Sequence, residues 1–80
     1  MRLFQDDSGE SWQAMAVDHV VAHGKMGAAL VFVPANEPSA EPLRTGVTFN
    51  STRAADLTLR TLGEKELRRR LKVARAEAAG

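Results

Sequence analysis

Residues 28–34 read AALVFVP, the longest unbroken apolar run in the chain, with a glycine before it and a proline at its end. A short apolar run bounded in this way is typical of a β-strand buried on both faces. Leu30 and Phe32 would point to one side of a sheet, and Val31 and Val33 to the other. We therefore expect this strand to be central, with something covering each of its faces.

The segments before this strand predict an N-terminal hairpin. Residues 2–5 are short and extended in character, and residues 6–9 read DDSG, a run of turn formers that ends in glycine. A second strand should begin near residue 10 or 11. Residues 12–23 also fit helical spacing, but we favour a strand because the turn chemistry and the upstream Phe4 suit a hairpin. Residues 22–27 would then form the turn into the central strand.

The segments after the central strand predict a loop and further extended structure. Residues 34–42 contain three prolines and should form an exposed loop. Residues 43–49 alternate apolar and polar side chains, which indicates a half-buried strand. Residues 55–60 alternate as well, and we interpret them as a fifth short strand or an extended crossing.

The last quarter of the chain predicts a helix. Thr61 and Glu64 have the spacing of a capping box, with Thr61 as N-cap, and the helix should continue to about Ala78. Its narrow apolar stripe consists of Leu67, Leu71, Ala74 and Ala78. Such a stripe can lie close to a sheet but covers only one of its faces.

These segments predict an α+β fold, a small antiparallel sheet of four or five strands with an N-terminal hairpin and one amphipathic C-terminal helix. We expect one domain over residues 1–80, with the sheet in residues 1–60 and the helix in residues 61–79. The side chains expected to be mostly buried are Phe4, Trp12, Leu30, Phe32, Val47, Phe49, Leu67 and Leu71.

Composition narrows the class of protein. Eighty residues allow only a small core, and the absence of cysteine excludes disulfides and thiolate zinc ligands. Acidic residues follow the N-terminus where a signal peptide would be apolar, and no apolar run approaches the roughly 20 residues that span a bilayer. We therefore expect a cytoplasmic protein, at most peripheral to the inner membrane.

The charge is unevenly distributed. The chain has a net charge of +1, but residues 1–61 hold five basic and seven acidic residues, whereas residues 62–80 hold six basic and three acidic residues. A slightly acidic body thus precedes a basic helix, which could contact nucleic-acid phosphate, anionic lipid or an acidic protein surface. A solvated helix face explains the same residues without any partner.

The sequence contains no convincing motif for metal binding, phosphate binding or catalysis. His19 and His23 would face one metal ion only on a helix, and no third cysteine or histidine exists. Asp6 and Asp7 are favoured turn formers, and Gly24 to Gly27 matches no phosphate-loop spacing. No acid, base and nucleophile converge, so we expect neither an enzyme nor a bound cofactor or metal.

A partner-binding surface is the better hypothesis. We expect contact through the apolar sheet face that the helix leaves open, through the loop at residues 34–42, or through both, with the basic helix adding electrostatic steering. The candidate residues are Arg68, Arg69, Lys72, Val73, Val31 and Val33. Nucleic acid is the alternative partner, but the chain has no tyrosine and its few aromatic residues are better used in the core.

The residues Asp7, Gly9, Trp12 and Ala14, followed by the central strand and the segment Thr61 to Leu67, resemble a group of small bacterial domains. Those domains open D-x-x-G-x-x-W-x-A and end in a capped helix, and they have no activity to transfer. The loop at residues 34–42 and the basic helix depart from their pattern. In size and character the chain is also similar to soluble accessory subunits of bacterial photosynthetic reaction-centre–light-harvesting complexes.

The function expected from the sequence is therefore a non-catalytic structural or accessory subunit that binds a larger protein assembly. The resemblance implies that this assembly is a membrane-associated photosynthetic complex, bound at its cytoplasmic surface. The alternative is a nucleic-acid-associated binding module that uses the basic C-terminal helix.

Overall fold

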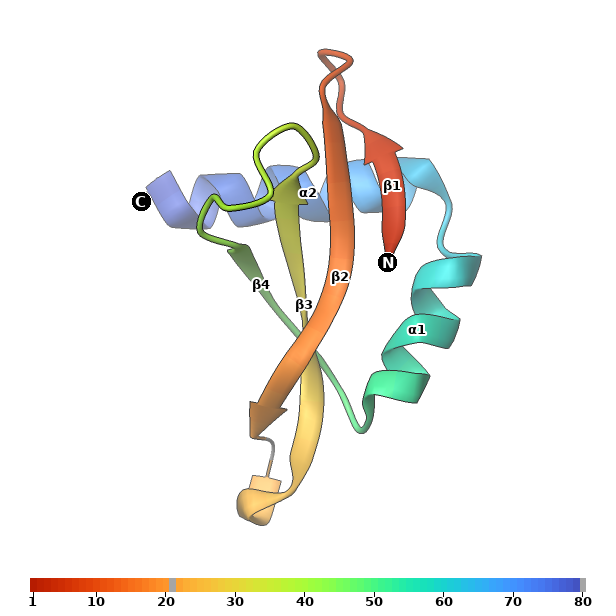
Figure 1. The fold of residues 1–80 in the computed structure, drawn as a ribbon, viewed down its shortest axis with the longest axis vertical. Helices are drawn as coiled ribbons and strands as arrows, with labels where there is room; N and C mark the ends of the chain where they lie inside the picture. The colour runs from red at the N-terminus through yellow and green to blue at the C-terminus, as the bar shows by residue number, and fades with distance from the viewer. Residues whose placement is uncertain (21, 80) are drawn as a thin grey trace.

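The computed structural model describes residues 1–20 and 22–79. Four strands, β1 (Arg2–Gln5), β2 (Ser11–Val20), β3 (Met26–Pro34) and β4 (Leu43–Phe49), form an antiparallel sheet in the order β1-β2-β3-β4 (Figure 1). Two helices follow, α1 (Thr52–Thr61) and α2 (Glu64–Ala79), and a single 3₁₀ turn, η1 (Ala22–Gly24), joins β2 to β3. The predicted α+β class, the antiparallel sheet and the C-terminal helix are confirmed.

The β1–β2 hairpin forms where the turn residues predicted it. The Asp6 and Glu10 backbones are hydrogen-bonded across the turn, and Gly9 adopts a left-handed conformation with a φ of 88°. Residues 12–20 are a strand, so the competing helical interpretation is wrong for this part of the segment. The strand is favoured because Trp12 and Ala14 alternate into the core beside Phe4.

The central strand β3 is apolar and buried along nearly its whole length. Phe32 and Leu30 point into the core with Phe4, Trp12 and Ala14, and this core also receives side chains from both helices, namely Leu59, Leu67, Leu71 and Ala74. Both helices therefore cover the same face of the sheet, and Figure 1 shows α2 crossing behind the strands. Six of the eight predicted core residues are buried, while Val47 and Phe49 are half-buried against the core.

The segment expected to be a fifth strand or extended crossing is instead helix α1. Ser51 is its N-cap, since the Ser51 side chain accepts a hydrogen bond from the Ala54 amide at 3.1 Å. Ala55 and Leu59 are four residues apart and face the sheet, whereas Leu57 is 55% exposed. A helix buries two apolar side chains here with every backbone group of its interior paired, which an isolated fifth strand would not achieve.

The predicted capping box is also wrong. Thr61 is the last residue of α1, and its hydroxyl donates hydrogen bonds to the carbonyls of Leu57 and Thr58. Helix α2 therefore begins at Glu64 instead of after Thr61. The stripe Leu67, Leu71 and Ala74 is buried as predicted, but Ala78 is exposed because α2 extends past the sheet there.

Arg2 joins the N-terminal strand to the end of α1. Its guanidinium donates hydrogen bonds to the carbonyls of Leu59 at 3.1 Å and Leu62 at 2.7 Å, at the C-terminal end of α1. Those carbonyls have no partner within the helix, and a cation beside them also opposes the negative end of the helix dipole. The first strand thus fixes the position of α1 through a charged cap.

Candidate partner-binding surfaces

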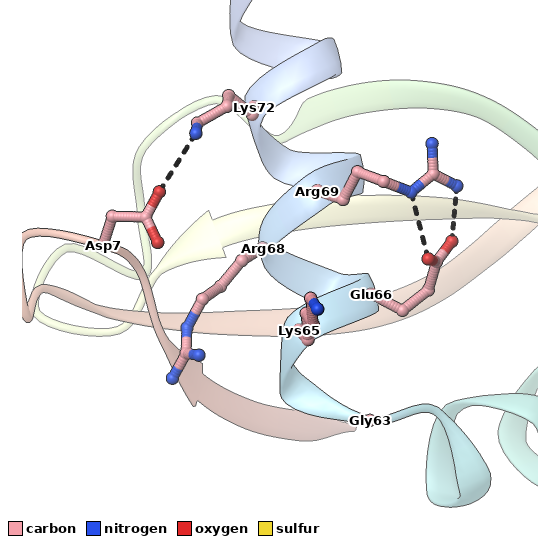
Figure 2. A pocket seen from close by; sticks show the side chains of 7 residues that line it. All are labelled: Asp7, Gly63, Lys65, Glu66, Arg68, Arg69 and Lys72. Atoms are coloured by element: carbon pink, nitrogen blue, oxygen red, sulfur yellow. Dashed lines mark hydrogen bonds and ion pairs between the residues drawn. The ribbon is translucent and has the colours of Figure 1, made fainter.

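The basic residues of α2 lie on its outer side. Arg68, Arg69 and Lys72 line a shallow hollow of about 540 Å³ together with Asp7, Gly63, Lys65 and Glu66 (Figure 2). Figure 2 shows Arg68 and Arg69 extending to opposite sides of the helix, while Lys72 reaches toward the β1–β2 turn. The hollow holds four cationic and two anionic side chains, so it is electropositive in formal charge.

Ion pairs neutralise most of this positive charge. Lys72 Nζ lies 3.2 Å from Asp7 Oδ2, and Arg69 makes two contacts with Glu66, at 2.6 and 3.0 Å. The hydrogen bond from Arg69 and the charge of Arg69 lower the pKa of Glu66, and the hydrogen bond to Glu66 and the charge of Glu66 raise the pKa of Arg69. The six cations of α2 stand beside three glutamates of the same helix and two aspartates of the turn. Exposed pairs stabilise little, but they leave little uncompensated charge to attract an anionic partner.

Arg68 has a structural role. Its Nε donates a 2.8 Å hydrogen bond to the Gln5 carbonyl, and its Nη2 pairs with Glu64 Oε2 at 3.0 Å. This side chain therefore joins α2 to β1, in addition to lining the hollow.

A second structural contact joins the β1–β2 turn to α2. The Asp6 carboxylate accepts hydrogen bonds from the Ser8 amide and hydroxyl, the Glu10 amide and Trp12 Nε1, all at 2.8–3.0 Å. The Ser8 hydroxyl contributes most, and these bonds together outweigh burial and lower the pKa of Asp6 to about 2. Arg75 lies 3.6 Å from Asp6 Oδ2 and 4.9 Å from the Trp12 ring centroid. Arg75 therefore completes the contact between turn and helix.

The opposite face of the sheet carries no helix in the described parts of the chain, because both helices pack on the Phe32 side. We call it the bare sheet face. Alternation and strand register assign to it Leu3, Gln5, Ser11, Gln13, Met15, Val17, His19, Gly27, Ala29, Val31, Val33, Arg44 and Thr48. Its centre is apolar, while its β4 margin is polar.

Val31 and Val33 lie on the bare sheet face as predicted, but they are only 1% and 4% exposed. In the register Met15 and Arg44 lie directly opposite Val31 on its two sides, so their longer side chains shelter it. Leu3 is 60% exposed and Met15 and Val17 are half-buried. A partner would therefore contact Leu3, Met15 and Val17 before the two valines of β3.

The structure separates the residues that the sequence grouped together. Arg68, Arg69, Lys72 and Val73 belong to the helical layer, where Val73 is 47% exposed beside β4. Val31 and Val33 lie across the sheet from them. The basic helix consequently does not border the apolar patch, and Arg44 is the cation on that face.

The loop at residues 34–42 lies at the C-terminal end of α2. A hollow of about 460 Å³ there is lined by Trp12, Pro34, Ala40, Glu41, Leu43, Arg75, Ala78 and Ala79. The loop residues Pro34, Ala40 and Glu41 thus lie beside the C-terminal end of the helical layer.

Sequence reasoning did not identify Leu3, Met15, Val17 or Arg44 as candidate contacts. The alternation of β2 placed Met15 and Val17 opposite Trp12, which was a usable signal. Only the register showed that these side chains, and not those of β3, form the accessible part of the patch.

The two histidines considered as metal ligands in the sequence analysis are not arranged as a pair. His19 lies in strand β2, and His23 is exposed in the η1 turn with a φ of 59°, so the pair is not presented on one helix face. Within residues 1–20 and 22–79, no group of three or more metal-ligating side chains is present. No helix of the same residues is both long and apolar enough to cross a bilayer.

Comparison with protein-family models, with curated proteins and with solved structures gives no match. The resemblance to small bacterial domains therefore stays a prediction from the sequence.

Proposed function

We propose that this chain is a non-catalytic structural or accessory subunit that binds a protein partner through its bare sheet face. The observation that carries the proposal is the composition of that face. An antiparallel sheet with one face in water normally alternates apolar and polar residues. Strand β4 does so, but β2 and β3 place Met15, Val17, Ala29, Val31 and Val33 on the side that the helices leave open.

Nucleic acid is the weaker candidate. The cations of α2 are largely engaged by Glu64, Glu66, Asp6 and Asp7, which leaves few of them to replace counterions on phosphates. The aromatic side chains are buried or half-buried in the core, so they offer no surface on which bases could stack.

The narrower expectations rest on sequence resemblance alone. A photosynthetic membrane complex as the partner, and a cytoplasmic position at the inner membrane, remain predictions. The bare sheet face itself requires only that the partner present a complementary apolar surface.

Site-specific photo-cross-linking tests the proposal. A photoreactive amino acid at Gln13, between Leu3 and Val33 in the register, should cross-link to protein in cells of the source organism. The same group at Leu57, which is exposed on α1, should not. Cross-links from both positions, or from neither, would contradict the proposal.

A charge variant separates the two candidate functions. Replacing Arg69 and Lys72 by glutamine, with Arg68 kept because it joins α2 to β1, should leave the Gln13 cross-link intact and change mainly its dependence on salt. Loss of all binding in this variant, with a steep decline of wild-type binding as salt rises, would favour nucleic acid or anionic lipid.

A further inference from the structure

A small hollow lies between helix α2 and the edge strand β4. Its volume is about 80 Å³, and it is lined by Thr45, Val47, Arg69, Arg70 and Val73. The β4 side of this hollow is fixed in place, because the Thr45 hydroxyl donates to the Leu30 carbonyl at 2.9 Å and accepts from the Val47 amide at 3.1 Å. The β4 side is also uncharged, so the charge of the hollow comes from the two arginines of α2. We call it the β4–α2 hollow.

The size of the β4–α2 hollow limits what can occupy it. Sites for cofactors and other small molecules have volumes of about 300–1,000 Å³, several times the volume of about 80 Å³ found here. A side chain of a docked protein needs less enclosure, because the rest of the partner is held by the surrounding surface. Val73 lines the hollow and is 47% exposed, so it offers apolar surface for such a contact. The hollow therefore suits a single side chain of a protein partner.

The positive charge beside this hollow is incompletely compensated. Glu66 Oε2 lies 2.6 Å from Arg69 Nη2 and 3.1 Å from Arg70 Nε, so two arginines share one carboxylate. Each of the other ion pairs between described residues of α2 and their partners joins one cation to one carboxylate. Two guanidiniums offer ten N–H donors, whereas one carboxylate has about four acceptor positions. The group formed by Arg69, Arg70 and Glu66 thus has a formal net charge of +1 and a surplus of donors.

A carboxylate is the anion that fits this group best. The planar donor forks of arginine match the geometry of a carboxylate, and a carboxylate carries the single negative charge that balances the group. A phosphate group carries a charge of about −1.5 to −2 and would lie near the Glu66 carboxylate with one net positive charge to offset it. The Arg69 side chain is 63% exposed, so it can reach such a group without being buried first. The chemistry therefore favours an aspartate or glutamate side chain.

We propose that a protein partner inserts the carboxylate of an aspartate or glutamate beside Arg69 and Arg70, and that an apolar residue next to it contacts Val73. The β4–α2 hollow lies on the helical layer, separate from the bare sheet face. The inference therefore goes beyond the proposed function and does not depend on it.

NMR titration of the purified chain with two blocked peptides tests the inference. The probes are acetyl-Leu-Asp-Leu-amide and its neutral counterpart acetyl-Leu-Asn-Leu-amide, which both place a leucine on each side of the tested group. The aspartyl peptide should bind about two- to fivefold more tightly, the range expected for an exposed ion pair. It should shift the methyl signals of Val47 and Val73 and the guanidinium signals of the two arginines. The methyl signals of Val31, on the bare sheet face, should not move.

Charge variants on the two sides of the ion pair should have opposite effects. Arg70→Gln leaves Arg69 matched to Glu66 and should remove the preference for the aspartyl peptide. Glu66→Gln leaves both arginines uncompensated and should tighten binding of the aspartyl peptide about two- to fivefold. Arg53→Gln is the matched control, because Arg53 is exposed on α1 and its loss lowers the net charge of the chain as Arg70→Gln does. Trp12 fluorescence shows whether each variant is folded, and the comparison of the two peptides on the wild type needs no variant.

Each other result overturns the inference. Equal binding of the two peptides, no binding up to about 10 mM, or shifts confined to other residues would show that the hollow does not recognise a carboxylate. A loss in Arg53→Gln as large as that in Arg70→Gln would mean that net charge attracts the peptide. Tighter binding of acetyl-Leu-phosphoserine-Leu-amide at the same residues would assign the hollow to phosphate. The Gln13 cross-link tests the proposed function separately, and none of these results changes its outcome.

Discussion

Phe32 is the side chain on which the stability of this fold should depend most. It is 0% exposed, and its ring meets the Phe4 ring edge-on, with centroids 5.5 Å apart and an interplanar angle of 64°. It lies on the central strand, between Ala14 of β2 and Leu43 of β4 in the register. Neither neighbour can move far, because each is fixed by its own strand pairing, so a cavity at Phe32 should persist.

Phe32→Ala should therefore cost roughly 3–5 kcal/mol of unfolding free energy, the range for truncation of a buried aromatic. A domain of this length has a total stability of about 4–12 kcal/mol, so the variant should be close to unfolding. Phe32→Leu retains most of the volume and should cost about 1–2 kcal/mol, mainly for the lost ring contact. Phe32→Ala should therefore lose more unfolding free energy than Phe32→Leu, because it leaves the larger cavity.

Urea unfolding monitored by fluorescence measures these costs, because Trp12 is the single tryptophan and is 6% exposed beside Phe4. Leu57→Ala is the control, since an exposed side chain should change stability by about 0.5 kcal/mol or less. A loss below about 1 kcal/mol for Phe32→Ala would refute the reasoning. It would mean that the site collapses around the deletion or that Phe32 is not central to the core.

Two further predictions concern the contacts that close the fold. The pKa of Asp6 is lowered from 3.8 to about 2, so its ionised form stabilises the folded state above the unfolded value, and this contribution should be lost as the pH falls from about 4 to about 2. Asp6→Asn should be less stable at neutral pH and should lack this part of the acid decline in urea midpoints; an unchanged decline would exclude Asp6 as its source. Arg2→Gln should cost about 1.5–3 kcal/mol through the lost charged hydrogen bonds to Leu59 and Leu62. Hydrogen exchange should then rise at the end of α1, and unchanged protection there would contradict the capping role.

Local patterns correctly predicted the sheet. The apolar run of β3, the alternation of β4 and the turn formers at residues 6–9 each act over a few residues, and the observed strands follow them. Period-two alternation and turn conformation depend on backbone geometry that neighbouring residues impose. The choice of strand over helix for residues 12–20 was correct for the same reason.

The sequence of residues 55–60 was ambiguous because its apolar residues fit both a strand and a helix. Ala55, Leu57 and Leu59 alternate like a strand, yet Ala55 and Leu59 also lie four residues apart on a helix. Ser51 before this segment was the unused signal, since serine is a favoured N-cap. The sequence analysis instead took Thr61 as the N-cap of the following helix, but Thr61 is the last residue of α1.

Contacts between distant residues decided the candidate surfaces. The pairs Arg68–Gln5, Lys72–Asp7 and Arg75–Asp6 join the two ends of the chain. The two ion pairs among them, together with the ion pairs inside α2, offset most of the positive charge of this segment. The sequence by itself determined that β3 is apolar on both sides. Only the tertiary structure decided that both helices cover the Phe32 side of the sheet. The apolar stripes of α1 and α2 can reach the same side only because the chain changes direction between the two helices. That arrangement leaves Leu3, Met15 and Val17 accessible on the other face, away from the basic helix.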